Sequence, residues 1–98
     1  MPPKYDFAAA DRLSQQLFQL VGRLESFIQL REGQCKALLG GRHSENWQGE
    51  RRDVFQSHFR GQQTALGALK EAAIKLQSQV ASATTAAHAA EKAEKNKQ

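Results

Sequence analysis

The sequence predicts an all-α protein, an antiparallel two-helix hairpin with a Trp-x-Gly turn that dimerises into a four-helix bundle. After Pro3 the chain contains no proline, so no residue interrupts a helix by lacking a backbone N–H. Apolar residues recur at steps of three and four along two long arms, which is the helical period. A polar segment with glycines, 40–49, separates the arms near the middle of the 98 residues.

The first predicted helix spans about residues 7–39, and Asp6 is placed to cap its N-terminus. Its apolar residues form two adjacent stripes, which together are wider than one neighbouring helix would cover. We therefore expect one stripe to face the second helix and one to face a partner, although the sequence leaves open which stripe does which. The stripe assigned to the hairpin consists of Leu13, Leu17, Leu20, Leu24 and Phe27, and the partner surface is expected to include Phe18, Val21 and Ile28.

The predicted turn, 40–49, is polar except for Trp47. Two interpretations of Trp47 remain open: a plug that covers the end of the hairpin, or an exposed aromatic that a partner recognises. Gly49 suits a backbone position with φ > 0 or a close approach.

The second predicted helix spans about residues 50–91. After Val80 the seam side chains shrink to alanine and bury little area, so we expect this end to fray. The single domain is expected to cover 1–92, followed by a disordered basic tail, 93–98. The predicted seam is polar only at Gln62 and otherwise begins with Phe55, Phe59, Leu66, Leu69, Ala73, Leu76 and Val80.

No residue set indicates catalysis, and we expect no enzyme activity and no cofactor. The three histidines do not have the spacing of a metal motif, and the single cysteine, Cys35, provides no second thiol ligand. The sequence has neither a nucleophile elbow nor a phosphate-binding glycine loop.

The formal net charge is +4, but most basic residues are scattered along the arms, so no nucleic-acid partner is expected. No apolar run approaches the roughly 18 residues of a membrane span, and stable membrane insertion is not expected. The start of the chain has no apolar segment typical of a cleaved signal peptide.

Trp47 and Gly49 between two helices of a chain of this length resemble the WXG family, the small helical-hairpin proteins of type VII (ESX) secretion. The resemblance covers essentially the whole chain and includes the apolar spacing after the turn. It implies that Trp47 and Gly49 form half of a composite export signal. The other half in the family is a tail motif, Tyr-x-x-x-Asp/Glu. Here Glu91 occupies the acidic position as a possible remnant, whereas Ala87 occupies the tyrosine position.

The resemblance implies a secreted protein that is cytoplasmic before export and that carries no cleaved signal peptide. It also implies a homodimer, or a heterodimer with another WXG-type protein or a larger toxin, recognised by the type VII secretion ATPase. The missing tyrosine suggests the half of a pair that supplies the Trp-x-Gly turn. The alternative is an intracellular helical adaptor or a nucleic-acid-associated hairpin that is not exported.

Overall fold

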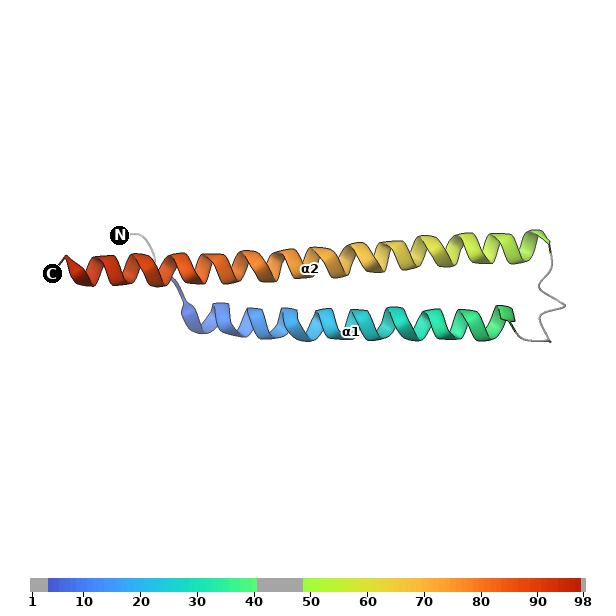
Figure 1. Ribbon diagram of the computed structural model, residues 1–98, viewed down its shortest axis with the longest axis horizontal. Coiled ribbons are helices and arrows are strands. Elements are labelled where there is room, and N and C mark those ends of the chain that lie inside the picture. Colours follow the sequence, from blue (N-terminus) through green and yellow to red (C-terminus); the bar gives the residue numbers. More distant parts are fainter. Residues whose placement is uncertain (1–3, 41–48, 98) are drawn as a thin grey trace.

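A computed structural model of the chain describes residues 4–40 and 49–97. Two helices, α1 (Phe7–Gly40) and α2 (Glu50–Asn96), make up this part, and it contains no strand. They run in opposite directions and lie side by side as a hairpin of 77 × 18 × 16 Å (Figure 1). The prediction of an all-helical hairpin is confirmed. Trp47 lies outside the described residues.

The two helices begin in different ways. The Asp6 carboxylate accepts a hydrogen bond from the Ala9 N–H at 2.9 Å, so the predicted cap of α1 is confirmed. Helix α2 instead follows Gly49, whose φ is 72°, with no side-chain cap. Glu50 and Asp53 lie in the first turn of α2, where negative charge stabilises the positive end of the helix dipole.

Helix α2 continues farther than the sequence predicts. The segment 93–96, predicted to be disordered, is helical, and α2 extends past the start of α1 (Figure 1). The physical reason is composition, because this segment consists mainly of the helix formers Ala, Glu and Lys and contains no glycine or proline. The Lys97 N–H closes the helix by donating to the Glu94 carbonyl at 3.2 Å.

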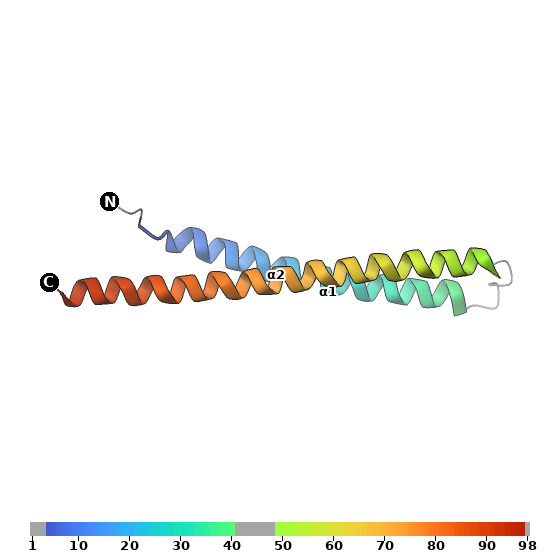
Figure 2. The same ribbon diagram turned by 90° about the horizontal axis from the view of Figure 1, so that it is seen from above.

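The core is a thin seam along the line where the helices meet. Only Leu17, Leu24 and Ala73 are buried among the described hydrophobic residues, with exposed fractions of 7%, 9% and 6%. The partly buried positions around them follow a seven-residue repeat, which is the pattern of wound helices, and the ribbons cross in the perpendicular view (Figure 2). Partly buried seam positions are Ser14, Val21, Ile28 and Cys35 on α1 and Phe59, Gln63, Leu66, Lys70, Gln77, Val80 and Thr84 on α2.

The structure assigns the apolar residues of α1 to the seam and to the exposed surface differently from the sequence prediction. Leu17 and Leu24 face α2 as predicted, but Leu13, Leu20 and Phe27 are 40%, 41% and 46% exposed. Val21 and Ile28, which the sequence pattern assigns to a partner surface, are instead partly buried in the seam. Helix α2 is likewise turned about its own axis relative to the predicted orientation, so Leu69 and Leu76 are 51% and 43% exposed.

A polar cluster inside the seam accounts for this rotation. Arg31 is partly buried and donates from Nε to Oε1 of Gln63 at 2.8 Å and from a terminal nitrogen to Oε1 of Gln62. The guanidinium carbon lies 5.7 Å from the centre of the Phe27 ring and 5.2 Å from that of Phe59. Gln63 also donates to the Ile28 carbonyl at 3.0 Å. With Gln63 turned toward α1, the Arg31 guanidinium and the Ile28 carbonyl have hydrogen-bond partners. The same orientation turns the row of Leu69 and Leu76 away from α1.

Candidate interaction surface

A leucine face runs along one side of the hairpin. We define it by Leu13, Leu20 and Phe27 of α1 and Leu69 and Leu76 of α2, which are all at least 40% exposed. Within each helix these residues are seven apart, so they form one row. Each row adjoins the buried positions by steps of three or four, Leu20 beside Leu17 and Leu24, for example.

The two rows lie on the same side of the hairpin. Two right-handed helices that run in opposite directions and face each other place equivalent rows on one common face. A groove of about 460 Å³ at the turn end is consistent with this placement, because residues from the continuation of both rows line it. Gln34 continues the α1 row, and Phe55 and Gln62 continue the α2 row. The leucine face therefore reaches from the middle of the hairpin into this groove.

The hairpin leaves more surface in contact with water than a compact protein of its mass. Its accessible surface is 8102 Å², whereas a compact monomer of this mass would have about 5,600 Å². Isolated exposed leucines are ordinary, whereas an exposed row of them along one side of a thin hairpin is a candidate interaction surface.

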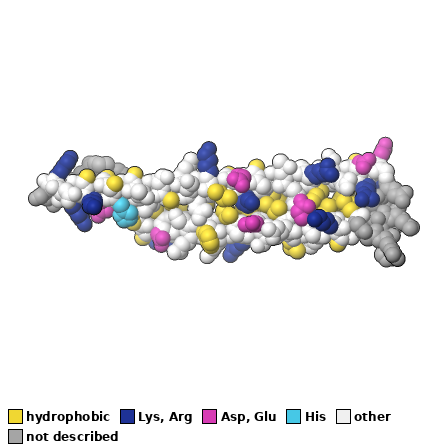
Figure 3. Space-filling model, viewed as in Figure 1, with side chains coloured by type: hydrophobic (Ala, Val, Ile, Leu, Met, Phe, Trp, Pro, Cys, Tyr) yellow, Lys and Arg dark blue, Asp and Glu magenta, His cyan; other side chains and the backbone are white. Residues whose placement is uncertain are grey.

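The opposite face carries a smaller apolar patch with charges around it. Phe18 is 71% exposed and Ile74 is 39% exposed, and both adjoin the other edge of the seam. Figure 3 shows one face of the hairpin, on which hydrophobic side chains follow the line between the helices while acidic and basic side chains lie close together around it.

The turn contributes one described residue of the predicted signal. Gly49 has φ 72° and ψ −139°, and no atom lies within 4 Å of the position that a Cβ would occupy. A side chain would therefore fit in space, and the backbone angle alone favours glycine there. The other predicted turn residue, Trp47, falls outside the described part of the chain.

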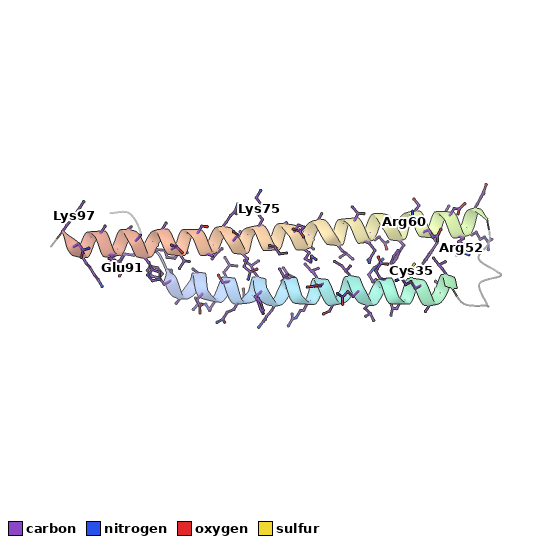
Figure 4. All side chains as sticks on the ribbon, in the orientation of Figure 1. Cys35, Arg52, Arg60, Lys75, Glu91 and Lys97 are labelled. Carbon is purple, nitrogen blue, oxygen red and sulfur yellow. The ribbon has the colours of Figure 1, made fainter. Side chains whose placement is uncertain are left out.

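The tail positions lie beside the N-terminal segment. Glu91 is exposed and Ala87 is partly buried, and Glu91 lies on α2 near the start of α1 (Figure 4). The Tyr5 hydroxyl is 2.7 Å from the Thr84 hydroxyl. Counting equal distances from the turn, 40–49, along both arms places Tyr5 opposite Thr84. The helical period within each arm does not reveal this contact, because the contact depends on the register of the two helices across the turn.

Two aromatic contacts complete this arrangement. The Phe7 ring stacks on His88 with centroids 4.1 Å apart, and Tyr5 packs edge-on against Phe7 at 4.9 Å. We call Tyr5, Phe7, Thr84 and His88 the N-terminal clasp. The clasp fastens the start of α1 to the alanine-rich end of α2, where aliphatic packing is weakest.

The side chains near the turn offer little chemistry. Cys35 lies between the helices (Figure 4) and lines the groove together with His58 and Arg31. Within residues 4–40 and 49–97 no group of three or more His, Cys, Asp or Glu side chains is arranged to hold a metal ion.

Neither described helix is both long and apolar enough to cross a membrane.

The structure thus places Leu17, Leu24, Val21 and Ile28 in the seam and brings the N-terminal segment to the tail region of α2. Comparison of the chain with protein-family models, with curated proteins and with solved structures gives no match. The resemblance to the WXG family consequently depends on the residues of this chain alone.

Proposed function

We propose that the chain is a small substrate of a type VII (ESX) secretion system, or a co-secreted partner and targeting factor, of the WXG type. It acts by helix–helix dimerisation and by presenting the turn with Trp47 and Gly49 to the secretion ATPase. The observation that carries the proposal is the position of Gly49. It adopts a left-handed backbone angle directly before α2, two residues after Trp47, at the end of a long antiparallel hairpin.

Dimerisation is supported by the leucine face. A second hairpin packed on it would bury Leu13, Leu20, Phe27, Leu69 and Leu76 and would produce a four-helix bundle. At about 25 cal/mol for each Å² of apolar surface removed from water, such burial is the main stabilising term available to this molecule.

The N-terminal clasp supports a role for Tyr5 in the tail half of the signal. The family motif has a tyrosine where this chain has Ala87, but Tyr5 lies beside Thr84, one helical turn before Ala87. The hairpin therefore places its only tyrosine next to the segment that ends at Glu91. We assign to Tyr5 and Glu91 together the part that the tail motif performs in the family.

The decisive test is the substitution Trp47→Ala in a host with an active type VII system. We expect the variant to remain helical and to associate normally while it is no longer exported. The matched control is Gln48→Ala, which changes the neighbouring residue and should leave export intact. If Trp47→Ala unfolds the chain, Trp47 is a structural plug, and if it is exported normally, the signal assignment is wrong.

A second pair of variants tests the tail assignment. Tyr5→Ala should reduce export strongly, whereas Tyr5→Phe keeps the ring and tests the hydroxyl alone. Both variants are compared by circular dichroism with the parent chain. Normal export of folded Tyr5→Ala would remove Tyr5 from the signal and leave the turn proposal standing.

A further inference from the structure

The charged residues of the two helices are divided unequally between the two sides of the hairpin. Around the leucine face, the outward rows of α1 and α2 contain no Asp or Glu within Phe7–Gly40 and Glu50–Asn96. The charged residues of these rows are Arg23 and Arg51, both exposed; His58 belongs to the same row as Arg51 and lines the groove. The remaining polar residues around the leucine face are neutral: Gln16, Gln34, Gln62 and Gln79.

The acidic residues of the paired region lie toward the other side. On α1, Asp11, Glu25 and Glu32 belong to the same seven-residue row as Phe18, which adjoins the opposite edge of the seam. On α2, Asp53 belongs to the row of Ile74, and Glu71 lies next to that row. The leucine face is therefore apolar with a basic rim, and the opposite face is of mixed charge.

Arg31 adds to the positive potential at the groove. Its hydrogen bonds go to the amide oxygens of Gln62 and Gln63, which are neutral, and the two phenylalanine rings next to it are uncharged as well. The guanidinium is partly buried, and the nearest carboxylate in this network, that of Glu32, accepts a hydrogen bond from the Gln63 amide at 3.2 Å.

We infer that the leucine face binds a different helical protein, an amphipathic helix pair whose apolar stripe is bordered by carboxylates, in preference to a second copy of this chain. In a two-fold pair of identical faces, Arg23, Arg51 and His58 would meet only basic or neutral groups, and this repulsion would oppose association. A partner with an acidic rim would bury the same leucines and would neutralise the rim. This inference rests on the proposed dimerisation, and it names the chemistry of the partner.

The test uses the chain itself as the acidic partner. In the probe variant, Arg23→Glu and Arg51→Glu reverse two exposed charges beside the leucine face. The matched control, Arg12→Glu with Lys75→Glu, makes the same change in net charge at exposed positions away from that face. Lys75 points away from α1 (Figure 4). Binding of each unlabelled chain to N-terminally labelled wild-type chain is measured by fluorescence titration at low and high salt.

We expect the wild-type chain to bind the probe variant with a Kd roughly ten-fold lower than its Kd for itself, from two or three new charge pairs. High salt should remove most of this preference. The control variant should bind as the wild type does. Equal binding of the probe and the control would overturn the inference, as would a tight wild-type dimer, or a longer assembly, that does not respond to salt.

A neutral variant tests the same inference in case the charge-reversed probe variant does not fold. Arg23→Gln with Arg51→Gln removes the repulsion without adding acids, so its self-association should exceed that of the wild type by a few fold at low salt. No increase in a folded neutral variant would contradict the inference. These outcomes are independent of the export phenotype of Trp47→Ala, so a homodimer would overturn the partner chemistry and leave the proposed function in place.

Discussion

The turn half and the open half of the hairpin are held together by different means. Toward the turn, large side chains line the seam and the groove, with Phe55 and Phe59 stacked at 6.3 Å and Arg31 held between amides and rings. Toward the open end, α2 offers mainly alanine after Val80, and the N-terminal clasp replaces continuous packing. The difference shows that a helix pair with little area to bury can be closed by a few directed contacts at its end.

The largest effect is expected from the packed half. Leu24→Ala removes one of the three buried side chains and should lower the free energy of unfolding by about 2–3 kcal/mol. Val80→Ala, at a partly buried position in the open half, should cost about 1 kcal/mol. Urea unfolding followed by circular dichroism, at one chain concentration, measures both. Equal losses would mean that the two halves do not differ in packing.

The clasp should give a smaller and more local effect. Phe7→Ala removes the stacked and the edge-on ring contacts and should cost about 1 kcal/mol. Amide hydrogen exchange should show faster exchange in residues 80–91 and unchanged exchange in 55–66, because the loss is confined to the open end. Faster exchange in both segments would indicate that the hairpin opens only as one unit.

The glycines inside the helices should give the smallest effect. At Gly22 and Gly61 no atom lies within 4 Å of the position that a Cβ would occupy, so alanine fits at both. Gly22→Ala and Gly61→Ala should each raise the free energy of unfolding, measured by urea titration, by about 0.5–1 kcal/mol. Gly49→Ala is the contrasting variant, and it should destabilise because its φ of 72° is unfavourable for a side chain. A loss at Gly61 would reveal a contact that alanine blocks.

The sequence was sufficient for the two helices, for the Asp6 cap and for the place of Leu17 and Leu24 in the seam. The sequence was insufficient to predict how each helix is turned about its own axis, and therefore which apolar rows face the other helix. Three adjacent rows of α1 are apolar, so their period cannot select the two that face α2. The choice depends on Gln63, whose amide reaches Ile28 and Arg31 across the hairpin. Such long-range polar contacts leave no periodic signal within one helix.

The candidate surface was predictable to a similar extent. The sequence predicts that one stripe of α1 faces a partner, and the structure leaves Phe18 exposed but exchanges Val21 and Ile28 for Leu13, Leu20 and Phe27. The helical period did not predict the N-terminal clasp, because Tyr5 and Thr84 are 79 residues apart in the sequence. Its signals in the sequence are the aromatic pair Tyr5 and Phe7 at the start of the chain and the count of equal distances from the turn, which places Tyr5 opposite Thr84.

The elongation of the hairpin has a hydrodynamic consequence. Its radius of gyration is 22.0 Å, whereas a compact domain of this length would have about 13 Å. A radius of this size corresponds to a compact domain of roughly 400 residues. A single hairpin will therefore leave a gel-filtration column far ahead of globular standards of equal mass and will tumble anisotropically, with its slow rotation about the short axes. Elution volume alone would make one chain resemble an oligomer, and only scattering or sedimentation equilibrium will count the chains.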